Sequence, residues 1–86
     1  MSPEANHIDL KRNINASIRK LPPEEMTMPT RTMVLFDLAA PRMKDSSKVE
    51  VLQHVQSLMA QPAAQRNEGM RGLHQLLRDI TKGEKL

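Results

Sequence analysis

The sequence predicts an all-α fold, a small bundle of three to four short helices that forms a single domain over residues 1–86. Two observations predict it: apolar side chains recur every three to four residues along most of the chain, and helix-capping residues precede these runs. A chain of 86 residues is long enough for one small domain. Because it has one Phe and neither Trp nor Tyr, aliphatic side chains and seven Met must form the core.

The first predicted helix spans residues 3–21. Ser2 is its candidate N-cap, and a proline stands at the first helical position, where proline is favoured. One face then carries apolar residues at helical spacing, namely Leu10, Ile14, Ile18 and Leu21. The Pro22-Pro23 pair is expected to end this helix, so residues 22–31 are interpreted as a connector.

Residues 32–40 fit two interpretations, of which a short helix is favoured. The consecutive apolar run at 33–36 is typical of either a buried strand or a buried short helix. The three residues before Pro41 favour helix by propensity, and a single strand would have no partner within the chain. A polar connector at 41–47 is expected to follow.

The third predicted helix spans residues 48–60 and begins with a capping box of Ser47 and Glu50. Its apolar residues cover an arc of about 180° on an ideal helix, which is wider than a surface helix needs. We therefore expect this helix to contact neighbours on two sides and to lie at the centre of the core.

A connector at 61–66 leads to the fourth predicted helix at 67–82, with Asn67 as its cap and Gly83 after its end. Gly69 falls on the apolar stripe of this helix. Either the helix begins later, near Gly72, or a partner helix approaches closely at Gly69, and the later start is favoured because glycine costs little where a helix frays. Residues 83–86 are expected to form a frayed tail. The predicted core comprises Leu10, Ile14, Ile18, Leu35, Phe36, Leu38, Leu52, Val55, Met59, Leu73, Leu77 and Ile80.

Composition and charge exclude several classes of protein. Without Cys, the chain has no disulfide, thiolate metal site or cysteine nucleophile. The net charge of +3 is compatible with nucleic acid or an acidic partner but requires neither. No apolar stretch approaches the ~20 residues that span a bilayer, and the first residues lack the features of a signal peptide, so we expect a cytoplasmic protein without membrane contact.

The sequence contains no recognisable catalytic or metal-binding motif. Its histidines (His7, His54 and His74) are never four residues apart, so none forms a helical pair suited to zinc. Glu50 and His54 share a helix face, which is typical of a surface pair that supports the helix far more often than of a metal site. Phosphate-binding loops and nucleophile elbows are absent from the sequence. We therefore expect neither enzymatic activity nor a cofactor or metal.

The favoured functional hypothesis is a small regulatory or adaptor protein that binds a larger protein, as an inhibitor, antiactivator or escort. It depends on the apolar surface of the last two helices and on methionines in the predicted connectors, since flexible thioethers suit adaptable binding surfaces. Accessory proteins of phages and plasmids are often of this size, an analogy that no motif supports. The predicted partner face comprises Met26, Met28, Met43, Val51, Leu58, Met70 and Leu76.

The alternative hypothesis is a dimeric, helical DNA-binding regulator that uses a helix-turn-helix-like pair over residues 48–82. The basic side chains of the last helix would then meet DNA, although the turn is long for that motif. The candidate nucleic-acid contacts are Arg66, Arg71, His74, Arg78, Lys82, Arg12 and Arg19. Under either hypothesis a homodimer or hetero-complex through the helices at 48–60 and 67–82 is expected, because a small chain with few aromatic residues gains stability by association.

Overall fold

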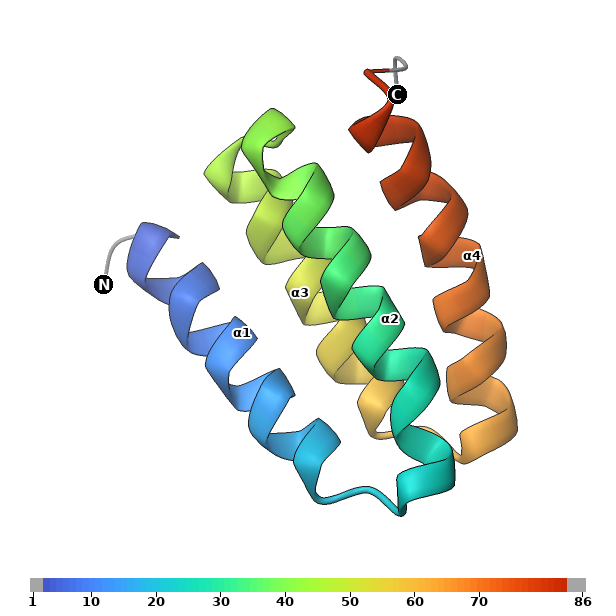
Figure 1. Cartoon of the computed structure of the whole chain (residues 1–86). Coiled ribbons are helices and arrows are strands. Elements are labelled where there is room, and N and C mark those ends of the chain that lie inside the picture. Colours follow the sequence, from blue (N-terminus) through green and yellow to red (C-terminus); the bar gives the residue numbers. More distant parts are fainter. Residues whose placement is uncertain (1–2, 84–86) are drawn as a thin grey trace.

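The structure, a computed structural model, describes residues 3–83, and their side chains from residue 7 onwards. It contains four α-helices and one short 3-10 turn: α1 (Pro3–Arg19), α2 (Pro23–Ala39), η1 (Ala40–Arg42), α3 (Asp45–Met59) and α4 (Ala63–Thr81). Successive helices run in alternating directions (Figure 1). The described part of the chain contains no strand, which confirms the all-α class and makes residues 32–38 helical.

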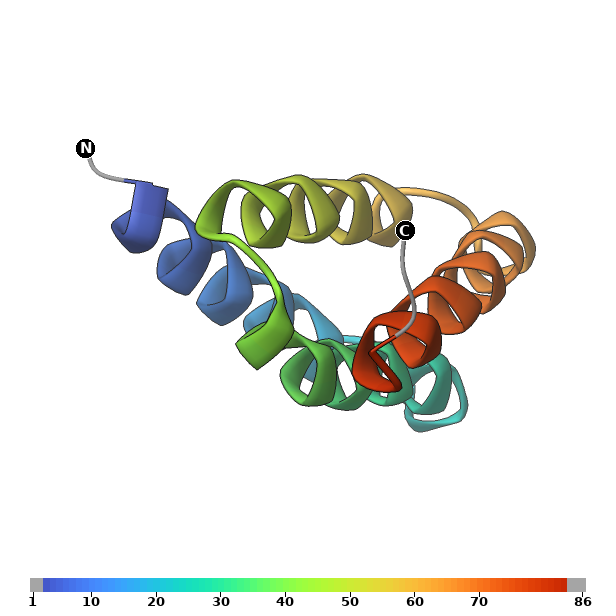
Figure 2. The same ribbon diagram turned by 90° about the horizontal axis from the view of Figure 1, so that it is seen from above.

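The helices pack in two main pairs. α1 lies along α3, α2 lies along α4, and the contacts between α1 and α2 and between α3 and α4 are smaller (Figures 1 and 2). α3 therefore touches two neighbours, as expected. α3 and α4 meet at the loop over residues 60–62 and diverge towards their other ends. None of the described helices is both long and apolar enough to cross a bilayer.

The connector predicted at residues 22–31 is wrong, because α2 begins at Pro23 and runs through it. The second proline of the Pro22-Pro23 pair starts a helix, since its fixed φ suits the first helical position. Pro29 lies inside the helix and leaves the Glu25 carbonyl without its N–H donor. The Pro29 ring is fully buried, so we infer that its packing offsets the lost hydrogen bond.

The other helix boundaries differ from the prediction by a few residues. α1 ends at Arg19, and its candidate cap Ser2 lies outside the described residues. Ser47 is not a cap, because α3 begins at Asp45, whose charge suits a helix N-terminus. α4 begins at Ala63, directly after Pro62, so Asn67 is an interior residue and not a cap. The predicted end of α4 is confirmed, since Gly83 follows it with a φ of +81°, a conformation that favours glycine.

The core joins all four helices, and its largest fully buried apolar side chains include Ile14, Leu52 and Met70. Most predicted core residues are buried, while Leu10, Leu35 and Met59 are partly buried against the core. Leu38 is the exception, with 57% of its surface exposed, because it lies on the outer side of α2. The fully buried core consists of Ile14, Ile18, Met33, Phe36, Ala39, Leu52, Val55, Met70, Leu73, Leu77 and Ile80.

Gly69 marks the close approach of two helices. A Cβ atom placed on Gly69 would overlap Cδ2 of Leu58 on α3 and lie 3.1 Å from its Cδ1. The later helix start near Gly72 is therefore wrong, and the close approach is confirmed within the same chain. Most of the apolar residues of α3 and α4 are thus covered by the chain itself, although Leu76 remains 37% exposed, and a homodimer through these helices stays a prediction.

The two glycines of α4 should respond differently to alanine. Gly72 has nothing within 4 Å of its hypothetical Cβ, so Gly72→Ala should raise the free energy of unfolding by about 0.5–1 kcal/mol through helix propensity. Gly69→Ala should gain less, or lose stability, because Leu58 must move. Urea denaturation measures both variants. An equal or larger gain for Gly69→Ala would contradict the packing of α3 on α4.

Candidate functional site

A groove lies where the ends of α3 and α4 diverge, and we call it the α3–α4 groove. It has a volume of about 370 Å³, which is near the lower end for ligand-binding sites. Its lining comes from the segment around η1, from α3 and from α4, and comprises Arg42, Met43, Lys44, Ser47, Glu50, Val51, Leu76 and Ile80.

Four apolar side chains form the floor of the α3–α4 groove. Met43 has an extended backbone and lies between η1 and α3, and Val51 lies on α3. Leu76 and Ile80 are four residues apart on α4, so they project from the same side of that helix. Leu76 remains 37% exposed while Ile80 is buried, so the groove offers apolar surface at its mouth and a closed base.

The rim of the groove carries more positive than negative charge. Arg42 and Lys44 line it, and neither forms an ion pair with a carboxylate among side chains 7–83. Glu50 is the acidic residue of the lining. An apolar floor beside available cations suits a ligand that has both apolar and acidic groups.

The groove gathers part of the predicted partner face and leaves the rest elsewhere. Met43, Val51 and Leu76, three residues of the predicted partner face, line it together. Met70 is fully buried in the core, so its assignment to a partner face is wrong. Leu58 packs at Gly69, and Met28 packs against the core. Met26 lines a different hollow on α2.

Exposed cations and exposed aliphatic side chains also occur on the outer sides of α2 and α4, and we call this set of residues the α2–α4 face. Its cations are Arg31 on α2 and Arg71, Arg78 and Lys82 on α4, all of them exposed. Its aliphatic residues are Val34 and Leu38 of α2, which are 53% and 57% exposed. None of the four cations pairs with a carboxylate among the described side chains.

Two buried polar contacts join α2 to α4 beneath this face. Arg66 Nη2 donates to Glu25 Oε1 at 2.7 Å, and Thr32 Oγ1 lies 2.6 Å from His74 Nε2. Arg66 and His74 are each only 4% exposed, which removes both from the candidate nucleic-acid contacts. The burial of Arg66 and His74 was not predicted from the sequence, because both side chains are polar. In addition, the predicted start of the last helix at residue 67 left Arg66 in a connector.

The Thr32–His74 contact is a buried side-chain hydrogen bond between α2 and α4. The single hydroxyl proton of Thr32 is donated to the Met28 carbonyl oxygen at 2.9 Å. When the hydroxyl donates to Met28, its oxygen is left to accept a hydrogen bond from Nε2 of His74. Burial, followed by the charges of Arg78, Arg31 and Arg71, lowers the pKa of His74 below its ordinary value of 6.5.

This lowered pKa predicts that the fold loses stability in mild acid. The unfolded chain protonates His74 as pH falls through about 6.5, whereas the folded chain resists protonation until the lowered pKa is reached. The contribution is therefore complete above pH 6.5 and is lost as pH falls from there towards the folded pKa. Urea denaturation between pH 7.5 and 5 should show a smaller loss in His74→Gln than in the wild type.

The matched control is His54→Gln, because His54 is exposed on α3. It should keep the pH dependence of the wild type. An unchanged pH dependence in His74→Gln would show that the buried histidine does not control acid stability.

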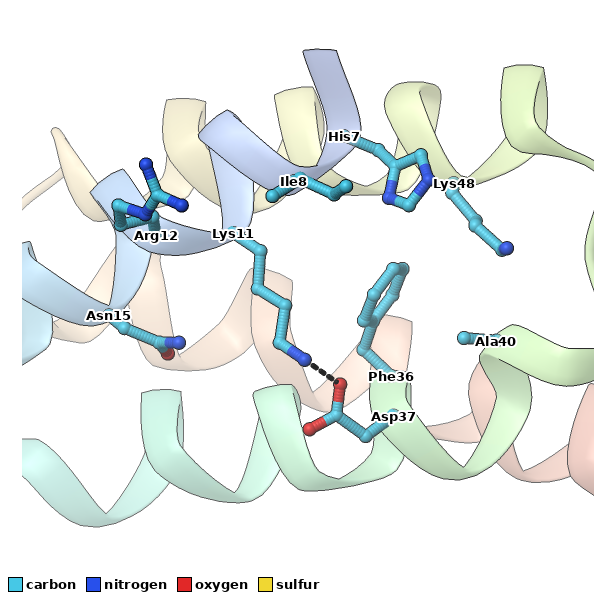
Figure 3. A pocket seen from close by; sticks show the side chains of 9 residues that line it. All are labelled: His7, Ile8, Lys11, Arg12, Asn15, Phe36, Asp37, Ala40 and Lys48. Atoms are coloured by element: carbon cyan, nitrogen blue, oxygen red, sulfur yellow. Dashed lines mark ion pairs between the residues drawn. The ribbon is translucent and has the colours of Figure 1, made fainter. Parts of the chain in front are cut away.

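The third hollow lies between α1 and α2 and has a volume of about 420 Å³ (Figure 3). Phe36 lines it, and Lys11 crosses it to Asp37 with an Nζ–Oδ1 distance of 2.7 Å. The other cations of its lining also face carboxylates: Lys48 lies 3.3 Å from Asp45, and Arg12 lies 3.8 Å from Asp9. Since these charges are already balanced, the hollow is a weaker candidate for a charged ligand than the groove.

Arg12 and Arg19 belong to α1 and do not extend the α2–α4 face. The described residues hold no group of three His, Asp or Glu side chains that could bind a metal ion. Comparisons with protein-family models, curated proteins and solved structures found no match to the chain.

Proposed function

We propose that the chain is a non-enzymatic regulatory or adaptor protein that binds a larger protein through the α3–α4 groove. The observation that supports this is the convergence of Met43, Val51 and Leu76 on one concave apolar surface. Aliphatic and thioether side chains in a groove are typical of sites that receive a side chain from a partner helix.

The positive charges on the rim of the groove favour a partner segment that carries negative charge. Arg42 and Lys44 form no ion pair with a carboxylate of residues 7–83, so the partner segment should carry carboxylates beside its apolar anchor. The occupant is therefore an acidic amphipathic segment of another protein, with one aliphatic side chain inserted between Met43 and Leu76. Binding such a segment is the mode of action that we expect of an inhibitor, antiactivator or escort.

Affinity capture from the cells that make the protein tests this proposal with paired variants. Leu76→Asp places a charge in the groove, and we expect it to lose the partner that the wild type captures. Ile8→Asp is the matched control, because Ile8 is 51% exposed on α1 and lies outside the groove. It should retain the partner. Circular dichroism must show that both variants remain folded.

Two results would overturn the proposal. Equal loss in both variants would indicate nonspecific apolar capture, and equal retention would place the partner elsewhere. A captured partner that Arg42→Glu binds more tightly than the wild type would contradict the acidic character that we assign to it.

DNA binding is the second candidate, favoured by the exposed row of Arg71, Arg78 and Lys82 on α4. It is weakened by the burial of Arg66 and His74, which removes two of the predicted contacts. Titration of a DNA duplex at increasing salt distinguishes the two candidates. Affinity for DNA should fall steeply with salt, whereas an apolar protein interface should change little.

A further inference from the structure

We propose that Arg42 and Gly83 determine which end of the α3–α4 groove receives the negative charge of a bound segment. Arg42 lines the groove from η1, and Gly83 follows the end of α4. Arg42 binds the carboxylate, and Gly83 is a positioning residue that leaves the space in which the Arg42 guanidinium lies. The inference rests on the proposed function, because it takes the groove as the binding site.

The approach of Arg42 to Gly83 is too close to admit a side chain at position 83. A Cβ atom placed on Gly83 would lie 2.7 Å from Nη1 of Arg42 and 3.7 Å from its Cζ. An alanine here would therefore displace the guanidinium. The φ of +81° at Gly83 is also a conformation that L residues with a side chain rarely adopt. The backbone and the neighbouring arginine thus both favour glycine.

The place that the guanidinium occupies is favourable for a cation. The last carbonyl groups of a helix lack intrahelical donors and carry a partial negative charge, and Arg42 lies at this end of α4. The guanidinium has five N–H donors, so it can face the helix end and a ligand carboxylate at once. Arg42 is also exposed, which makes it accessible to a ligand.

The position of Arg42 sets the orientation of the occupant. Leu76 precedes Gly83 by seven residues, which corresponds to about 10 Å along an ideal helix. Leu76 presents aliphatic surface at the mouth of the groove, and the buried Ile80 lies between these two positions. A ligand would therefore place its carboxylate at the Gly83 end and its apolar part towards Leu76. On a helical partner, this spacing corresponds to an acidic residue about two turns from the aliphatic anchor.

Octanoate is a minimal probe for this arrangement, because it joins one carboxylate to an aliphatic chain. Octanol is the matched probe without the charge. Binding of each to the full chain is measured by NMR, from the methyl resonances of Val51 and Leu76. Arg42→Gln and Gly83→Ala should each weaken octanoate binding at least fivefold, because the carboxylate loses a charge-assisted hydrogen bond. Both variants should leave octanol binding within twofold.

Two controls separate the positioning role of Gly83 from a general effect on the helix. Gly72→Ala adds the same methyl group to α4 where a Cβ meets nothing within 4 Å, so it should change neither affinity. In the Arg42→Gln background, Gly83→Ala should cause no further loss, because Gly83 acts through Arg42. A purely structural effect of Gly83→Ala would persist in that background and would weaken octanol binding too.

Three results would overturn the inference: unchanged octanoate affinity in Arg42→Gln or Gly83→Ala, equal losses for octanoate and octanol, and no methyl shifts at about 20 mM octanoate. Each of them can occur while Leu76→Asp still loses a captured protein, and then the proposed function survives without this inference. Conversely, the expected octanoate results without any captured protein would support the carboxylate end of the groove and contradict the protein partner.

Discussion

Leu77→Ala is expected to lower the free energy of unfolding by about 2–5 kcal/mol. Leu77 is fully buried, and its removal leaves a cavity between α4 and the helices that it packs against. A domain of this length has a total stability of roughly 4–13 kcal/mol, so the loss should be a large share of it. Chemical denaturation followed by circular dichroism measures the difference.

The neighbouring residue supplies the control. Leu76→Ala makes the same change at the next position of the same helix, where the side chain is partly exposed in the groove. It should cost less than about 1 kcal/mol. Similar losses in the two variants would mean that the buried side of α4 is assigned incorrectly.

Glu25→Ala should cost about 3 kcal/mol, because it leaves the Arg66 guanidinium without its carboxylate. Arg66 is buried, and removing one partner of a buried pair typically costs 3–5 kcal/mol. We place the loss at the lower end because the Glu25 side chain is 34% exposed and water can partly replace it. The Nε atom of Arg66 already lacks a hydrogen-bond partner, so the side chain has few alternatives.

Glu24→Ala is the matched control for this loss. Both glutamates lie in the first turn of α2, where a negative charge favours the helix, but the ion pair to Arg66 uses Glu25. Glu24→Ala should therefore lose no more than about 1 kcal/mol. Equal losses would assign the effect to the helix terminus and not to the pair. Arg66→Met should be tolerated better than Glu25→Ala, because it removes the buried charge itself.

The sequence was sufficient to predict the helices whose apolar residues recur clearly. The inward positions of α1, α3 and α4 follow from that spacing, and so do the core roles of Ile14, Leu52 and Leu77. Leu38 was wrongly assigned to the core because the sequence of the short predicted helix at 32–40 did not determine which of its sides faces inward. The longer α2 has its inner side fixed by Pro29, Thr32 and Phe36.

The first half of α2 could not be predicted from local rules. Prolines normally end helices, and here one begins the helix while another is accommodated inside it. What stabilises this segment is distant in the sequence: Glu25 binds Arg66, and Thr32 binds His74. Neither pair has a local signature, so the interior positions of Arg66 and His74 were also missed.

The groove was predictable only in part. The apolar character of Met43, Val51 and Leu76 is evident in the sequence, but their convergence depends on the angle between α3 and α4. That angle follows from tertiary packing, including the close approach at Gly69. The lack of ion pairs at Arg42 and Lys44 among side chains 7–83 likewise depends on which carboxylates the fold brings near them.

Photo-crosslinking from the groove tests the central claim most directly. A photoreactive amino acid at position 76 should join the chain to a partner protein in the cells that produce it, at a partner segment that carries carboxylates. The same amino acid at position 68, an exposed position of α4 outside the groove, should not form that product. Crosslinks of equal yield from both positions, or crosslinks from position 76 only to another copy of this chain, would contradict the proposed partner site.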